Sequence, residues 1–165
     1  MTGDDIDAAI DLLDQCRRAS VRLATAESCT GGMIGAALTA IAGSSDVVEC
    51  GFITYSNEAK HDMLGVPMVH FETVGAVSEA VARAMAEGAV ARSRADIAVS
   101  VTGIAGPGGG TETKPVGLVH MAVARHGRES LHERHVFDGD RDAVRQQTVT
   151  AALALIGQGL RSSMP

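Results

Sequence analysis

The hydrophobic positions of this chain follow two periods, one typical of helices and one typical of strands. Helical spacing, cap residues and glycine stops predict helices over residues 4–18, 32–42, 57–64, 78–92 and 140–160. Short runs that alternate or are rich in β-branched residues predict strands over residues 21–26, 47–55, 97–102, 116–125 and 129–137. Ser78 and Asp140 stand where their side chains can cap the helices that follow them.

The order of these elements predicts the fold class. Helices first alternate with strands, and His126-Gly127 then joins two strands as a hairpin. Ala and Val supply most of the apolar content, and small side chains allow helices to pack closely on a sheet. We therefore expect an α/β protein, a three-layer α/β/α sandwich with a mixed, mostly parallel sheet. The 165 residues fit one domain, 1–165, with an ordered core of about 5–160 and a tail that we expect to be unordered.

Composition and charge exclude several classes of function. The net charge is −6 without a run of Lys or Arg, and there are only three Phe, one Tyr and no Trp, so no nucleic-acid partner is expected. Cys16, Cys29 and Cys50 form no metal-ligand pattern, which favours reduced thiols, a cytoplasmic location and no metal site. The acidic amino terminus does not resemble a signal peptide, and no apolar run approaches the roughly 18 residues needed to span a bilayer, so no membrane association is expected.

Four segments with residues that packing does not require follow predicted strands, where the ligands of open α/β sheets gather. In the first, residues 25–32, a strand ends, Ser28 follows, and a helix begins at two glycines. Backbone N–H groups near Thr30 to Gly32 can hold a phosphate or an oxyanion. Ser28 is then a nucleophile or the helix N-cap, and this segment alone favours the cap. Cys29 is interpreted as a packing residue, because no histidine lies in a motif that would activate it.

The second segment, residues 54–60, places the chain's only tyrosine, Tyr55, at a strand end and Lys60 about one turn into the next helix. A lysine becomes a base at neutral pH only if its pKa falls from about 10.4 to about 7, which requires roughly 4–5 kcal/mol from burial or nearby charge. Such a lysine, alone or through the tyrosine hydroxyl, can take the proton of a serine. In isolation the segment favours a solvated lysine and a strand-end tyrosine.

The third and fourth segments can contact an anion. Residues 103–110 include five glycines in eight positions, which allows close backbone approach to a ligand, a mobile lid or a plain turn, and they match neither a Walker loop nor GxGxxG. Residues 139–145 place Arg141 and Arg145 four apart on one helix face. The two arginines can grip a substrate phosphate, although the neighbouring aspartates can also pair with them.

Six motifs occur in order along the chain: TAESCTGG at 25–32, GSS at 43–45, FITYSNEAK at 52–60, GAVSEAVA at 75–82, VTGIAGPGGGTETKPVGLV at 101–119 and GDRDAVR at 139–145. This set resembles the CinA carboxy-terminal domain family, and the resemblance covers about residues 5–160. It implies the α/β/α fold, a homo-oligomer with a dimer favoured, and hydrolysis of nicotinamide mononucleotide to nicotinate mononucleotide and ammonia without a metal or other cofactor.

Position by position, the resemblance places the nucleophilic serine on Ser28, the general-base lysine on Lys60 and the assisting tyrosine on Tyr55. Residues around these three are expected to bind the substrate, and Arg141 and Arg145 are matched to its phosphate. The expected substrate-binding residues are Glu27, Thr30, Gly31, Gly32, Asn57, Thr102, Gly103, Gly106, Arg141 and Arg145.

In the predicted reaction, neutral Lys60 takes the Ser28 proton directly or through Tyr55, and the alkoxide attacks the amide carbon. N–H groups near Thr30 to Gly32 stabilise the oxyanion, and water hydrolyses the acyl-enzyme. Two alternatives remain open at this point. One is a non-catalytic domain that senses nucleotides or binds partners in competence or DNA-damage responses, and the other is an amidohydrolase acting on a different pyridine or purine nucleotide.

Overall fold

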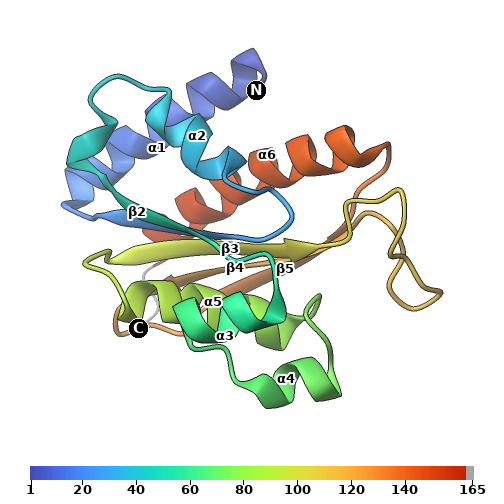
Figure 1. The fold of residues 1–165 in the computed structure, drawn as a ribbon. Helices are drawn as coiled ribbons and strands as arrows, with labels where there is room; N and C mark the ends of the chain where they lie inside the picture. The colour runs from blue at the N-terminus through green and yellow to red at the C-terminus, as the bar shows by residue number, and fades with distance from the viewer. Residues whose placement is uncertain (163–165) are drawn as a thin grey trace.

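A five-stranded mixed sheet with the strand order β2-β1-β3-β4-β5 forms the middle of the protein (Figure 1). The computed structural model describes residues 1–162, so most of the tail that we expected to be unordered lies outside the described residues. The strands are β1 (Leu23–Glu27), β2 (Val48–Ile53), β3 (Ile97–Gly103), β4 (Leu118–Arg125) and β5 (Leu131–Val136). The expected α/β class is confirmed.

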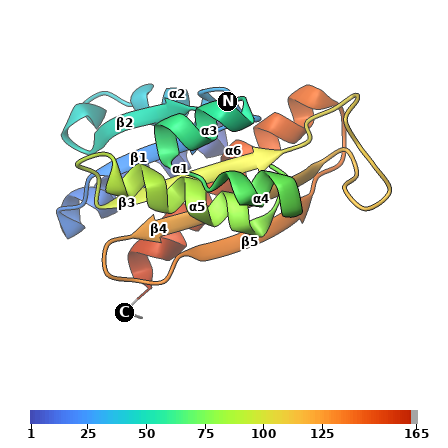
Figure 2. The same ribbon diagram turned by 60° about the horizontal axis from the view of Figure 1, so that its bottom comes forward.

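Helices cover both faces of this sheet, as expected for a three-layer sandwich (Figures 1 and 2). One face carries α1 (Gly3–Ala19), α2 (Met33–Thr39) and α6 (Arg141–Arg161). The other carries α3 (Asn57–Leu64), α4 (Met68–Thr73) and α5 (Glu79–Ala91). Two hydrophobic clusters fill the layers, and the one under α5 is built largely from alanines, which lets this helix approach the strands closely.

The expectation of a mostly parallel sheet was not accurate in detail. Strands β2, β1 and β3 pair in parallel, whereas β4 is antiparallel to both β3 and β5. Two connections cause this. The loop over residues 104–117 returns the chain so that β4 runs back beside β3. The hairpin that the sequence predicted at His126-Gly127 then reverses β5, because a short turn can only join antiparallel strands. The carboxyl ends of β1, β2 and β3 therefore share one edge of the sheet, which is the edge where we expected the site.

Side-chain caps begin most of the helices, and two of them were expected. Ser78 Oγ accepts the N–H of Val81 at 3.3 Å, and Asp140 Oδ1 accepts the N–H of Ala143 at 2.9 Å. Helix α4 and a short 3₁₀ turn over Ser44–Asp46 were not predicted. Helix α4 has no buried residue, so it lacks the apolar face on which periodicity depends.

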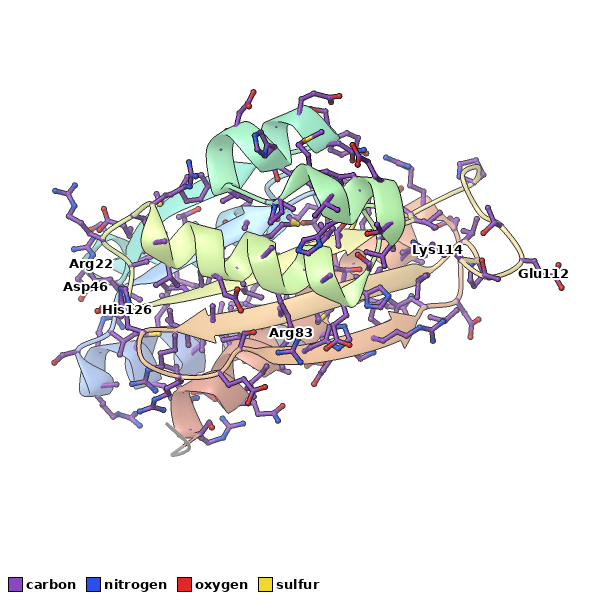
Figure 3. All side chains as sticks on the ribbon, turned by 90° about the horizontal axis from the view of Figure 1, so that it is seen from below. Arg22, Asp46, Arg83, Glu112, Lys114 and His126 are labelled. Carbon is purple, nitrogen blue, oxygen red and sulfur yellow. The ribbon has the colours of Figure 1, made fainter. Side chains whose placement is uncertain are left out.

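The glycine-rich segment forms a long loop, residues 104–117, that projects beyond the sheet. Glu112 lies at the outer part of this loop and Lys114 lies closer to the body (Figure 3). Arg22, Asp46 and His126 lie at the opposite end of the molecule (Figure 3). Within residues 1–162, no helix is both long and apolar enough to cross a membrane.

Candidate active site

Ser28 comes directly after β1, where the strand ends and the chain turns toward α2. Its backbone N–H still donates to Val101 O of the neighbouring strand at 3.1 Å, so the residue is fixed to the sheet. The serine is buried, with 8% of its surface exposed. Successive side chains of a strand point to opposite faces, so Ser28 points toward the α3 face while Glu27 points toward α2.

Lys60 reaches Ser28 from α3 and is buried, with only 1% of its surface exposed. Its Nζ lies 2.9 Å from Ser28 Oγ, 2.9 Å from Thr54 O and 3.1 Å from Tyr55 O. No ion pair within residues 1–162 includes Lys60. Burial without a carboxylate partner disfavours the ammonium form and lowers the pKa of Lys60 to about 8.

These three contacts suit a neutral amine. A neutral amine has two N–H bonds and one lone pair, and the two carbonyl oxygens can accept both N–H bonds. The lone pair is then left for the hydroxyl of Ser28, which can rotate to donate to it. The pair therefore has the geometry of a nucleophile with its base, in which the hydroxyl donates to Nζ.

Glu27 occupies the start of α2, where the sequence suggested a role for Ser28 as N-cap. Glu27 Oε1 accepts the N–H groups of Gly32 and Ile34 at 3.2 and 2.9 Å, and Oε2 accepts that of Gly35 at 3.0 Å. The Thr30 hydroxyl donates to Oε1 at 2.6 Å. Ser28 is therefore not the cap.

The same bonds remove Glu27 from the substrate-binding residues that we expected, because its carboxylate is buried and already accepts four donors. They also change the expected oxyanion donors. The N–H of Gly32 is held by Glu27, and the N–H of Gly31 donates to Ser28 O at 3.1 Å. Neither N–H is free for an oxyanion. The two glycines instead allow the chain to turn, because Gly31 has a φ of +58° and Gly32 a φ of +107°, values that other residues rarely adopt.

Tyr55 and Arg141 meet at the rim of the site. The Tyr55 side chain is exposed, and its hydroxyl accepts Arg141 Nη2 at 2.9 Å. Arg141 Nη1 donates to Gly106 O at 2.7 Å, which ties the glycine-rich loop to α6. Tyr55 contacts Lys60 through its backbone carbonyl, so its hydroxyl does not lie between Ser28 and Lys60 as a proton relay would require.

The remaining candidate residues have mainly structural contacts. Arg145 donates to two backbone carbonyls, from Nε to Cys29 O and from Nη2 to Thr30 O, each at 3.1 Å. Thr102 is buried and donates to Ala76 O at 3.0 Å. A Cβ at Gly103 would lie 2.7 Å from Val119 Cγ2, so this position excludes a side chain. Asn57 is exposed at the start of α3.

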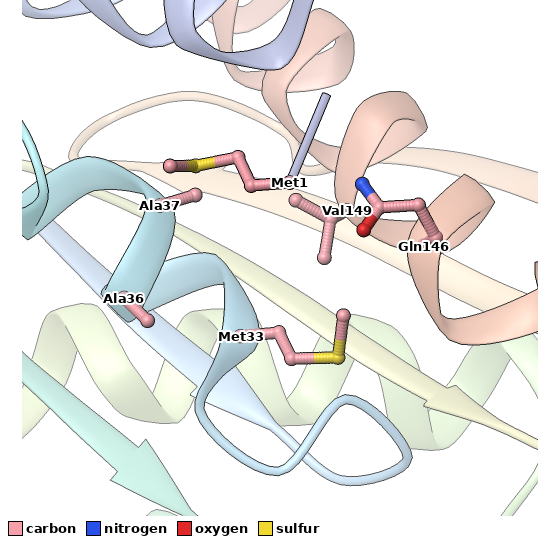
Figure 4. Close-up of a pocket in the computed structure, with 6 residues that line it drawn as sticks. All are labelled: Met1, Met33, Ala36, Ala37, Gln146 and Val149. Atoms are coloured by element: carbon pink, nitrogen blue, oxygen red, sulfur yellow. The ribbon is translucent and has the colours of Figure 1, made fainter. Parts of the chain in front are cut away.

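Two pockets lie near these groups. One, of about 430 Å³, adjoins Arg141 and is lined by Ala105, Pro107, Val116, Gly139, Asp140, Arg141 and Asp142. The other is apolar, has about 200 Å³, and is lined by Met1, Met33, Ala36, Ala37, Gln146 and Val149 (Figure 4). Neither includes Ser28 or Lys60. Of the two, the pocket at Arg141 is the one linked to Lys60 by contacts, because Arg141 donates to the Tyr55 hydroxyl and the Tyr55 carbonyl accepts Lys60 Nζ.

Cys29 and the histidines do not form a competing site. Burial raises the pKa of the Cys29 thiol to about 11, so the thiol stays protonated, as the interpretation of Cys29 as a packing residue requires. Within residues 1–162, no group of three or more His, Cys, Asp or Glu side chains could hold a metal ion.

Sequence reasoning missed the groups that surround the lysine amine. The backbone carbonyls of Thr54 and Tyr55 accept Nζ, and backbone acceptors leave no trace in residue type. The change from strand to helix over residues 54–60 was the only available signal, since a chain that leaves a strand exposes its last carbonyls.

The fold and the site define the class of this protein: an α/β sandwich with a serine and a buried lysine at the carboxyl ends of its parallel strands. Comparisons with known proteins define the family. The model of the CinA C-terminal domain matches residues 6–160, so this chain belongs to the CinA C-terminal domain family. It is similar to the crystal structure of competence/damage inducible protein CihA from Agrobacterium tumefaciens, with 48% identity, a TM-score of 0.94 and coverage of 98% of both chains.

Two of the proteins similar in sequence carry the name of an enzyme, and a third carries only the family name. The chain is 52% identical over 145 residues to "Nicotinamide-nucleotide amidohydrolase PncC" of Pseudomonas putida, covering 88% of this chain and 90% of the relative. It is 54% identical over 134 residues to the Escherichia coli K12 protein of the same name, covering 81% of each. A "CinA-like protein" of Synechococcus sp. is 52% identical over 93% of this chain, which spans 37% of that longer relative.

Proposed function

We propose that this protein is a nicotinamide-nucleotide amidase that hydrolyses the carboxamide of nicotinamide mononucleotide to nicotinate mononucleotide and ammonia. The observation that carries the proposal is the 2.9 Å contact between Ser28 Oγ and the Nζ of a buried lysine. Two relatives at 52% and 54% identity bear the name nicotinamide-nucleotide amidohydrolase, and this supports the substrate class.

Lys60 acts as the general base. With a pKa of about 8, roughly a tenth of the lysine is neutral at pH 7 and half at pH 8. Its two N–H bonds stay on Thr54 O and Tyr55 O, so the lone pair remains directed at the Ser28 hydroxyl. This amine takes the Ser28 proton directly, and no step requires the Tyr55 hydroxyl.

The reaction proceeds through an acyl-enzyme. Ser28 Oγ bonds to the amide carbon as its proton passes to Lys60, and the electron pair of the carbonyl moves to oxygen. The pair returns as the C–N bond breaks, and the lysine ammonium gives its proton to the departing ammonia. Lys60 then takes a proton from water, which attacks the acyl carbon, and Ser28 leaves with that proton.

Arg141 is the group that we place on the substrate phosphate. It is exposed, it borders the 430 Å³ pocket, and its guanidinium donates to the Tyr55 hydroxyl at the rim of the site that holds Ser28 and Lys60. Two carboxylates, Asp140 and Asp142, line the same pocket, and Arg141 is the cation of its lining that can pair with a phosphate.

The test is ammonia release by Ser28→Ala, with Ser45→Ala as the matched control at an exposed serine. We expect no turnover of nicotinamide mononucleotide by Ser28→Ala, nearly unchanged nucleotide binding by calorimetry, and full activity of Ser45→Ala. Mass spectrometry of quenched wild-type protein should show an acyl adduct on Ser28. Turnover by Ser28→Ala at the wild-type rate would contradict a covalent mechanism.

The substrate itself is tested by a panel of nucleotide amides with the matching nucleosides. A binding domain without catalysis would release no ammonia from any of them, and an enzyme for another nucleotide would prefer a different member. The expectations of a homo-oligomer, with a dimer favoured, and of a cytoplasmic location stay predictions.

A further inference from the structure

Two cations approach the residues after β1 from opposite faces of the sheet. We call residues 28–30 the nucleophile loop. Lys60 reaches this loop from α3, and Arg145 reaches it from α6 on the opposite face (Figure 1). The proposed function explains the lysine contact, whereas the arginine contact has no role in the steps described above.

Arg145 binds the backbone of the nucleophile loop rather than a carboxylate. Its Nε and Nη2 donate to the carbonyl oxygens of Cys29 and Thr30, both at 3.1 Å. Within residues 1–162 it forms no ion pair. Its charge therefore acts on two successive peptide groups, and those bonds already use two of the guanidinium nitrogens.

Through the peptide group between Cys29 and Thr30, this contact fixes the direction of the Thr30 N–H. The C=O and N–H of a trans peptide point in opposite directions. The cis bond found in residues 1–162 is Gly106-Pro107, so the peptide in question is trans. Because Arg145 draws Cys29 C=O toward α6, the N–H of Thr30 faces the α3 side, where Ser28 Oγ and Lys60 Nζ meet.

The Thr30 N–H is the donor left open beside the nucleophile. The N–H groups of Thr30 and Cys29 have no acceptor in another residue among residues 1–162, whereas those of Ser28, Gly31 and Gly32 all have one. Thr30 is fully buried before substrate binds, so its N–H carries the cost of an unpaired buried donor, about 1–3 kcal/mol, and an oxyanion reaches it only when the groups that cover it move on binding. The N–H of Cys29 lies beside its own thiol, which leaves Thr30 as the better donor.

We infer that Arg145 is a positioning residue that holds the Thr30 N–H as the oxyanion donor for the reaction at Ser28. This inference rests on the proposed function and deepens it. It also replaces the expected role of Arg145 on the substrate phosphate. The negative charge that develops on the former carbonyl oxygen receives the Thr30 hydrogen bond, and the guanidinium strengthens this donor by polarising the Cys29 carbonyl of the same peptide.

The experiment compares Arg145→Gln and Arg145→Lys with the wild-type protein on nicotinamide mononucleotide and on its phosphate-free nucleoside. Arg145→Gln should lower kcat by about 10- to 100-fold, less than the roughly 100- to 1,000-fold cost of deleting an oxyanion donor, because the N–H remains but is no longer held. KM should stay within about twofold and both substrates should lose the same factor, since no phosphate contact is removed. Arg145→Lys should fall between, because one ammonium cannot hold both carbonyls in the geometry of a guanidinium.

A pH profile separates positioning from a general structural defect. The midpoint near pH 8 should be unchanged in both variants, because Lys60 and its carbonyl partners are untouched. Arg94→Gln, at a side chain that is 90% exposed, is the matched control and should keep wild-type kcat. Circular dichroism and Tm report folding, and Arg145→Lys carries the test if Arg145→Gln does not fold.

Three results would overturn the inference. A rise in KM for the nucleotide alone would place Arg145 on the phosphate, and a kcat within twofold of wild type in both variants would remove any role in the reaction. If the nucleoside does not react, the nucleotide alone separates the two roles of Arg145: a loss in kcat supports positioning, and a rise in KM supports phosphate binding. A wild-type protein that releases no ammonia would refute the proposed function first, and the inference with it.

Discussion

The lowered pKa of Lys60 predicts how the stability of the protein depends on pH. In the unfolded chain the lysine holds its proton up to about pH 10.5, whereas in the folded protein it loses the proton near pH 8. Between these values the unfolded state binds more protons, so the free energy of unfolding rises with pH in this window. Below pH 8 the folded state instead carries the cost of a buried ammonium.

Lys60→Met removes this dependence while it keeps the size of the side chain. Proton linkage with pKa values of about 8 and 10.5 gives the wild type a gain of about 2.5 kcal/mol between pH 7 and 10, or about 2 kcal/mol once solvent screening is allowed for. The hydrogen bonds lost in the variant shift its stability similarly at every pH, so they cancel from this gain. The cysteines titrate in both proteins and cancel as well.

The measurement is urea unfolding of both proteins at intervals from pH 7 to 10. The difference in unfolding free energy, wild type minus variant, should rise by about 2 kcal/mol. Lys114→Met, which removes the only other lysine, should follow the wild-type curve because Lys60 is still present. Wild-type kcat/KM should rise about tenfold from pH 7 to 9 with the neutral fraction of Lys60, and Lys60→Met should show no turnover. Parallel stability curves, within about 0.5 kcal/mol, would show that Lys60 stays charged and would refute its role as base.

Three further substitutions test the parts that hold the site. Glu27→Ala should cost at least about 3 kcal/mol in urea unfolding, because three N–H groups at the start of α2, including that of its N-cap Gly32, lose their acceptor; a cost below 1 kcal/mol would contradict the buried bonds. Gly103→Ala should lower stability by about 1–3 kcal/mol, since its Cβ would lie 2.7 Å from Val119 and 2.9 Å from Leu118 O; an unchanged Tm would argue against this packing. Ser78→Ala should cost about 1 kcal/mol by removing the cap of α5 and should leave kcat unaltered, which ammonia release would check.

Local sequence predicted the elements of this protein, and the family resemblance named Ser28 and Lys60 as the candidate reactive pair. Periodicity, caps at Ser78 and Asp140, and the hairpin at His126-Gly127 depend on residues close together in the chain, so they could be predicted. Ser28 and Lys60 could be noticed because both follow strands, and the carboxyl ends of parallel strands meet at one edge. Their own segments favoured a helix cap and a solvated lysine, so only the resemblance to the CinA family suggested that they act together. The sheet proved less parallel than expected because the loop over residues 104–117 returns β4 beside β3 and the hairpin then reverses β5.

Tertiary structure alone decided what the polar side chains of the site do. Lys60 has a pKa lowered to about 8 only because α3 buries its amine against Ser28, 32 residues away, and no carboxylate among residues 1–162 pairs with it. Glu27 caps α2 instead of meeting a ligand, Tyr55 turns its hydroxyl to Arg141, and Arg145 holds a loop 115 residues earlier in the chain. The physical reason is that hydrogen-bond partners and burial depend on contacts between distant segments, and a linear pattern of residue types does not record which way a side chain points.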